Sequence, residues 1–152
     1  MSFSDKVKDI SEISGTKPWE NLSLQDALII IAMYATQLDP AAKDKKKVRR
    51  IADLAKEHPL FSEKSADVVA RIHRLVESSD MADLDQAVDQ AVKSLTLRLR
   101  QTAFEWAAEL AVGSGSLSKE KQEIVEQLRT KLFIDTHSAK KIINEAIADS
   151  TD

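Results

Sequence analysis

Hydrophobic residues recur every three or four positions along most of this 152-residue chain, which is the spacing of one face of an α-helix. Start and stop signals separate the stripes: the capping-box spacing Ser23-x-x-Asp26, the pair Asp39-Pro40, Pro59, and the turn at 113–116. Only three glycines and three prolines occur, whereas all-β folds need many turns. We therefore predict an all-α, compact bundle of about seven helices. The expected segments are roughly 3–14, 23–38, 40–58, 62–77, 81–112, 117–132 and 139–147.

Two segments make specific predictions. In the segment 62–77, helical spacing favours a buried face made of Ala66, Val69, Ile72 and Val76. The segment 81–112 contains no breaker and would be roughly 46 Å long as one straight helix. Because that length is large for so small a domain, we expect a bend near 96–100.

One helical pattern occurs twice. Ala32-Met33-Tyr34-Ala35 is echoed by Ala108-Glu109-Leu110-Ala111, 76 positions later, and each stretch is followed by a short polar turn and a second amphipathic helix. Such self-similarity predicts a pseudo-duplicated helical core. The alternative is chance, since two amphipathic stretches can often be aligned this well.

Composition limits the classes of protein. Hydrophobic residues make up 43% and charged residues 31%, and the net charge of −3 disfavours a nucleic-acid-binding domain. The absence of cysteine excludes disulfides and cysteine-ligated metal centres. The first residues do not resemble a signal peptide, and the longest apolar run, 27–35, is too short to span a bilayer. We expect a single domain over residues 1–152 and a cytoplasmic location.

The turn after the second copy carries a family resemblance. The stretch from Ala108 to Glu120 reads Ala-Glu-Leu-Ala-Val-Gly-Ser-Gly-Ser-Leu-Ser-Lys-Glu. It resembles the Ala-x-x-Asp-Gly-x-Leu-Ser-x-Glu-Glu pattern of the TerB-like family of tellurite-resistance proteins, and the likeness extends over about 22–148. The resemblance implies a compact helical domain with a pseudo-repeated core, and a role in a bacterial stress response.

The chain departs from that family pattern at acidic positions. The turn aspartate is replaced by Ser114 and the second glutamate by Lys121. Hard cations need several oxygen ligands, usually including more than one carboxylate. The remaining metal candidates are Asp39, Asp44 and Glu120.

Residues 43–50 include six basic residues in eight. Such a patch could dock an acidic partner, a phosphate-bearing ligand or an anionic surface, and the competing interpretation is a solvated helix face. Basic residues near the start of a helix gain nothing from its dipole, which favours the binding role. Trp19, in the connector before the second helix, is either an exposed anchor for a partner or a core residue. The candidate partner-binding residues are Lys45, Lys46, Lys47, Arg49, Arg50 and Trp19.

An acidic cluster lies at 77–89. Its carboxylates suit the first turn of a helix, and the cluster lacks the glycine and terminal glutamate of an EF-hand loop. Its members are Glu77, Asp80, Asp83, Asp85 and Asp89.

Catalytic motifs are missing from the sequence. The three histidines have no metal-ligand spacing, and we expect His73 to be a half-buried packing residue. A nucleophile elbow, a phosphate loop and a dinucleotide fingerprint are all absent. An enzyme would need catalytic carboxylates or histidines that converge from distant helices. A DNA-binding helix-turn-helix at 114–121 would lack a basic recognition helix.

Two hypotheses follow. The first is a non-enzymatic binding or scaffold protein without a cofactor, of the tellurite-resistance or stress-response type, acting through a protein partner. The alternative is a divalent-cation-binding or cation-responsive protein that uses Asp39, Asp44 and the acidic cluster at 77–89.

Overall fold

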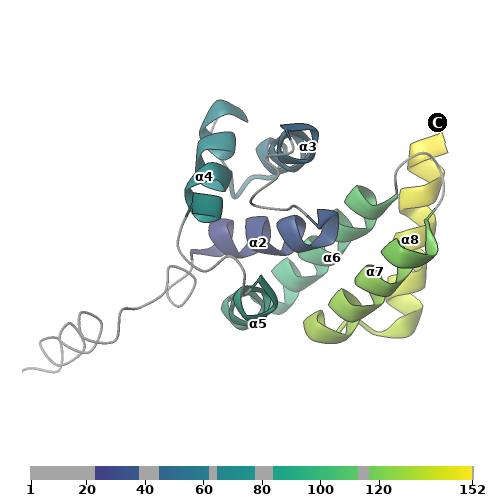
Figure 1. Ribbon diagram of the computed structural model, residues 1–152. Coiled ribbons are helices and arrows are strands. Elements are labelled where there is room, and N and C mark those ends of the chain that lie inside the picture. The colour runs from purple at the N-terminus through teal and green to yellow at the C-terminus, as the bar shows by residue number, and fades with distance from the viewer. Residues whose placement is uncertain (1–22, 38–44, 62–64, 78–83, 113–116, 152) are drawn as a thin grey trace, which may run out of the picture.

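The computed structural model describes residues 23–37, 45–61, 65–77, 84–112 and 117–151. All the regular structure in these ranges is helical, which confirms the predicted all-α class (Figure 1). The predicted helix 3–14 and the predicted helix start at Asp39-Pro40 lie outside them. The helices are α2 (Leu24–Thr36), α3 (Lys45–Lys56), α4 (Ser65–Glu77), α5 (Leu84–Ser94), α6 (Leu97–Ala111), α7 (Lys119–Leu132) and α8 (Thr136–Thr151).

Helix α2 lies at the centre of the fold. It begins as predicted at Ser23, whose side chain accepts a hydrogen bond from the backbone N–H of Asp26. Every residue from Ala27 to Ala35 is buried, because α3, α4, α5, α6 and α7 all pack against this helix. Between Ala27 and Ala35 the helix is therefore apolar on all sides.

The long segment 81–112 divides into two helices, close to the predicted bend. Helix α5 ends at Ser94, and Thr96 is in an extended conformation and accepts a hydrogen bond from the backbone N–H of Leu99. This N-cap starts α6 in a new direction. Both helices can then pack against α2, which a single straight helix could not do (Figure 1).

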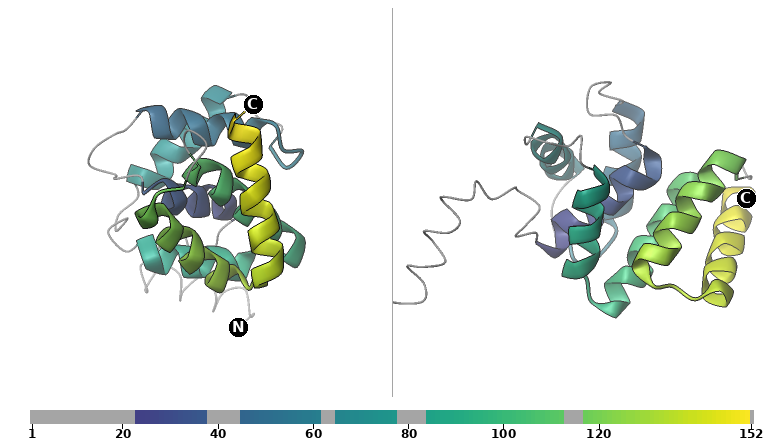
Figure 2. Two further views of the ribbon diagram at one scale, coloured as in Figure 1. Left: turned by 90° about the vertical axis from the view of Figure 1, so that its right-hand side faces the viewer. Right: turned by 60° about the horizontal axis from the view of Figure 1, so that its bottom comes forward.

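The remaining helices form two groups. Helices α3 and α4 pack against each other, whereas α7 and α8 both pack against α6, as the two views of Figure 2 show. Trp106 of α6 is 7% exposed and belongs to the core. Its ring centroid lies 6.0 Å from those of His58 and Phe61, in the turn after α3, so the two groups share one core.

The buried face predicted for α4 is right at Ile72 but not at Val69, and the side chains of Ala66 and Val76 lie outside the described residues. Val68 and Ile72 are fully buried and Leu75 nearly so, whereas Val69 is only half-buried and His73 is exposed. Two apolar pairs, 68–69 and 75–76, give this helix two stripes that share Ile72. Burial against α2 and α3 selects one stripe and leaves Val69 and His73 at the edge of the α3–α4 contact.

None of the helices in the described ranges is both long enough and apolar enough to cross a membrane.

Candidate functional site

A groove between α3 and α4 brings positive charge over an apolar floor. Lys45, Val48 and Arg49 line it from α3, and Val69 and His73 line it from α4, around a volume of about 280 Å³. Lys45, Arg49 and His73 are exposed, whereas Val48 is buried and Val69 half-buried. Among the described residues of this lining, all the polar side chains are basic. We call these five residues the basic groove.

Helical spacing explains the arrangement. Lys45 and Arg49 are four residues apart on α3, as are Val69 and His73 on α4, so each pair shares one face. His73 was expected to be a half-buried packing residue, and its position here corrects that prediction. The four-residue spacing of Val69 and His73 is visible in the sequence. Which side of α4 faces α3 depends on how the helices pack, so the position of this pair in the groove could be seen only in the structure.

The structure divides the basic patch that the sequence predicted. The ammonium of Lys47 donates to the carbonyl of Gln37, at 3.3 Å, and Nη2 of Arg50 donates to the carbonyl of Glu109, at 3.4 Å. These carbonyls belong to the C-terminal ends of α2 and α6, where positive charge is favourable.

Lys47 and Arg50 therefore contribute to packing, while Lys45 and Arg49 line the groove. Lys46 is exposed on α3, and Trp19 lies outside the described residues.

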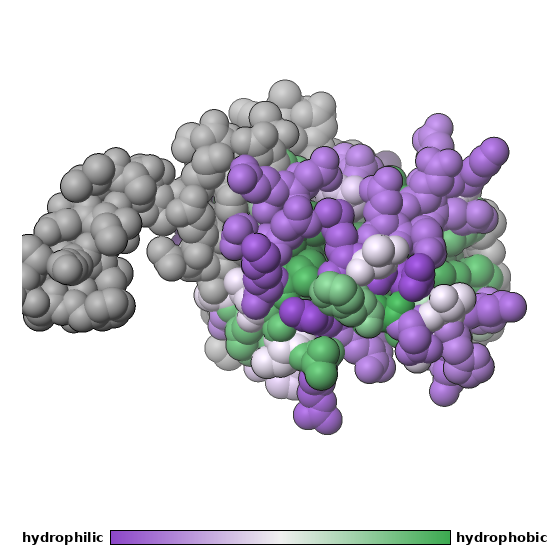
Figure 3. All heavy atoms as spheres, turned by 90° about the horizontal axis from the view of Figure 1, so that it is seen from below, coloured by the Kyte–Doolittle hydropathy of each residue, from purple (hydrophilic) through white to green (hydrophobic). Residues whose placement is uncertain are grey.

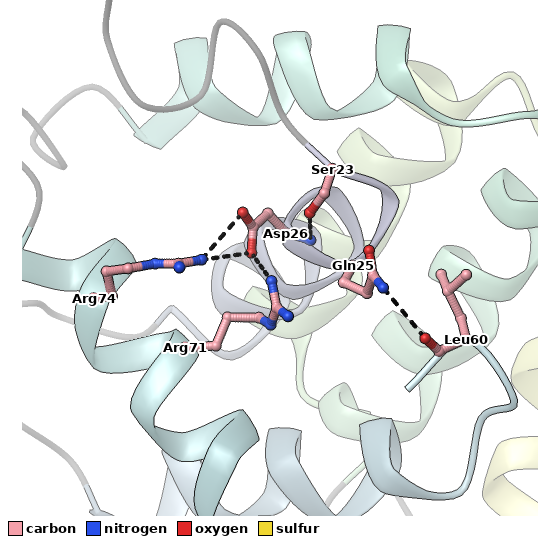
Figure 4. A network of polar contacts seen from close by, with 6 residues as sticks. All are labelled: Ser23, Gln25, Asp26, Leu60, Arg71 and Arg74. Atoms are coloured by element: carbon pink, nitrogen blue, oxygen red, sulfur yellow. Dashed lines mark hydrogen bonds and ion pairs between the residues drawn. The ribbon is translucent and has the colours of Figure 1, made fainter. Parts of the chain in front are cut away.

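The first turn of α2 fixes the frame around the groove (Figure 4). The carboxylate of Asp26 accepts from Arg71 at 2.8 Å and from Arg74 at 3.3 Å, which ties α4 to α2. On the other side of this turn, Nε2 of Gln25 donates to the carbonyl of Leu60, at 3.4 Å, in the chain that leaves α3. The first turn of α2 therefore contacts both α4 and the chain that follows α3, and the groove lies between these two helices.

Part of the predicted acidic cluster takes part in a polar contact between helices. Asp89 of α5 pairs with Lys131 of α7, at 2.6 Å, and the hydroxyl of Tyr34 donates to Gln127 Oε1. The hydrogen bond with Asp89 raises the pKa of Lys131, and burial, followed by the charge of Asp85, raises the pKa of Tyr34.

Asp89 therefore joins α5 to α7 through its ion pair with Lys131, and the charge of Asp85 in α5 acts on Tyr34 of α2. Asp80 and Asp83 lie outside the described residues, as does the side chain of Glu77.

Of the three predicted metal ligands, the described ranges include Glu120 alone. Asp39 and Asp44 lie outside them, and Glu120 is exposed in the first turn of α7, where a carboxylate suits the helix dipole. No three His, Cys, Asp or Glu side chains in the part that the structure describes are placed to hold a metal ion. The cation-binding hypothesis stays a prediction.

Two large apolar side chains are unusually exposed elsewhere. Leu97 is 78% and Phe133 76% exposed, and the guanidinium carbon of Arg100 lies 5.5 Å from the centroid of the Phe133 ring. Sequence reasoning did not single them out. Phe133 caps α7 with a positive φ of 59°, which turns it away from the stripe that ends at Leu132. Figure 3 shows the molecule from below, where hydrophobic side chains lie among hydrophilic ones.

The basic groove is the feature that combines charge, an apolar surface and a defined shape. It suits an anionic ligand that also carries an apolar group. Comparison of the chain with protein-family models, with curated proteins and with solved structures finds no match in any of the three.

Proposed function

We propose that this chain is a non-enzymatic binding protein that engages an acidic protein partner through the basic groove. The observation that carries the proposal is the convergence of Lys45, Arg49 and His73 over an apolar floor. These three side chains are exposed, so they can meet a partner without a change in the fold. Positive charge that is not used in packing favours association with an acidic surface.

A protein partner fits this groove better than a nucleic acid does. The net charge of the chain is −3, whereas nucleic-acid-binding domains carry a strong basic excess. The described residues that line the groove include no Phe, Tyr or Trp on which a base could stack.

We also propose that the helical core consists of two copies of one unit, as in the TerB-like family, and that the chain has a cytoplasmic role in a stress response. Helix α2 shifted by 76 positions overlaps α6, and α3 and α4 overlap α7 and α8 after similar shifts. The alignment of α3 with α7 pairs Val48, Ile51 and Ala55 of the first copy with Val125, Leu128 and Leu132 of the second. All six of these residues are buried. This agreement supports a common origin for the two halves, although the helices pack in different pairs.

Quantitative affinity capture from cell extract tests the binding role. The double variant Lys45→Glu/Arg49→Glu reverses two charges of the groove. The matched control is Lys140→Glu/Lys141→Glu, which makes the same change in charge at two exposed lysines of α8.

We expect at least one protein to be retained by the wild-type chain and by the control but lost from the groove variant. A set of captured proteins that is the same for all three chains would contradict the proposal. Circular dichroism establishes that each variant is folded.

A further inference from the structure

We infer that the partner segment bound by the basic groove is an extended acidic peptide with one large apolar side chain between its carboxylates. This inference rests on the proposed function and adds the chemistry of the ligand. It follows from three features of the groove: its size, the depth of its floor and the positions of its charges.

The size of the groove suits one apolar side chain. Pockets for drug-sized ligands usually enclose about 300–1,000 Å³. The basic groove, at about 280 Å³, lies below that range. It can accept one leucine- or phenylalanine-sized group, and the rest of the ligand must lie outside, along the rim.

The depth of the floor disfavours a flat anionic surface. Val48 is 6% exposed and Val69 is half-buried, whereas the basic side chains around them are exposed. A membrane surface would meet the charges first and would leave the valines uncovered. A peptide side chain that projects from its backbone can reach them.

The charges define the flanking residues. Lys45 and Arg49 stand on one wall and His73 on the other, and all three surround the floor that Val48 and Val69 form. In an extended peptide, residues two apart point to the same side and lie about 7 Å apart. An apolar residue that enters the groove therefore brings the carboxylates two positions before and after it towards Lys45 and Arg49 on one wall and His73 on the other.

The test is a titration followed by two-dimensional ¹⁵N–¹H NMR. The probe is a capped pentapeptide, Glu-Asp-Leu-Asp-Glu, and its matched control has Ala in place of Leu. We expect chemical-shift changes in α3 and α4, and binding of the leucine peptide about tenfold tighter than of the alanine peptide, since the larger side chain buries more apolar area.

Two variants separate the contributions of floor and charge. Val69→Thr keeps the shape of the side chain but adds a hydroxyl, so it should reduce the preference for leucine to about threefold. Lys45→Glu/Arg49→Glu should abolish binding of both peptides, and Lys140→Glu/Lys141→Glu should leave both unchanged. Because a hydroxyl at the half-buried position 69 can lower stability, circular dichroism establishes that Val69→Thr is folded before the titration.

The outcomes distinguish this inference from the proposed function. Equal affinity for the two peptides, together with a captured protein that depends on Lys45 and Arg49, would overturn the acidic–apolar ligand and leave the binding role intact. Failure of both capture and peptide binding would overturn both. Groove-dependent binding to vesicles containing anionic phospholipid, without peptide binding, would assign the site to a membrane surface instead.

Discussion

At the scale of single residues, Tyr34 shows how the core accommodates a polar group. Its side chain is 7% exposed, at the C-terminal end of α2, and its hydroxyl donates to Gln127 Oε1. Burial and the nearby carboxylate of Asp85 disfavour the phenolate and raise the pKa of Tyr34 above its ordinary value of 10.0. The folded state therefore holds the phenolic proton more tightly than the unfolded state does.

This difference predicts how stability depends on pH. A pKa that is higher in the folded state gives a contribution that is complete below pH 10 and is lost as the pH rises further. At pH 7, Tyr34→Phe should lower the free energy of unfolding by about 1 kcal/mol, through the lost hydrogen bond. Above pH 10 the gap between the wild-type chain and this variant should narrow.

Urea unfolding of both chains between pH 7 and pH 11 measures that gap. Tyr34 is the only tyrosine in the sequence, so absorbance of the phenolate reports on this group alone. A gap that stayed constant across this range would show that Tyr34 titrates alike in both states.

Single residues also show why the groove could be predicted only in part. The run of basic residues at 43–50 was visible in the sequence, and Lys45 and Arg49 do line the groove. The partners of Lys47 and Arg50 are carbonyls 10 and 59 positions away along the chain. Such contacts depend on how helices meet, which periodicity within one helix does not encode.

At the scale of helices, the residue at which a helix begins was easier to predict from the sequence than the face that the helix buries. The capping residue Ser23 could be read from a short sequence signature because its hydrogen bond is local. The division of 81–112 was expected from its length alone, and the cap at Thr96 locates it. On α4 the prediction held for Ile72 but not for Val69, because neighbouring apolar pairs make two stripes and packing against α2 and α3 chooses between them.

The position of α4 depends on the carboxylate of Asp26. The side chains of Asp26 and Arg71 are only 16% and 19% exposed, so the loss of this carboxylate would leave Arg71 in a poorly hydrated place. We predict that Asp26→Asn lowers the free energy of unfolding by about 2 kcal/mol. Urea denaturation measures the change.

Glu126→Gln provides the control for that variant. The carboxylate of Glu126 pairs with Arg129 at 2.6 Å within α7, but its side chain is 63% exposed. Its removal should cost at most about 0.5 kcal/mol, as is usual for exposed pairs. Equal losses of unfolding free energy in the two variants would mean that the ion pairs of Asp26 contribute no more than an ordinary surface pair does. Asp26 would then not hold α4 in place.

At the scale of the whole molecule, net charge and local charge oppose each other. The chain carries a net charge of −3, which repels an acidic peptide at long range, whereas the basic groove attracts it at contact. Added salt weakens both effects, but it acts most strongly on charges that are far apart, because the screening length is about 10 Å at 0.1 M. The sign of the salt dependence therefore shows which of the two effects dominates.

We predict that contact in the groove dominates. Raising NaCl from 50 to 500 mM should weaken binding of the Glu-Asp-Leu-Asp-Glu peptide by about fivefold, measured by the same NMR titration. The ratio between the leucine and alanine peptides should stay nearly constant, since the apolar contribution does not depend on screening of charge. Tighter binding at high salt would mean that repulsion by the whole acidic chain outweighs the attraction of Lys45 and Arg49, and that the groove does not select an acidic ligand.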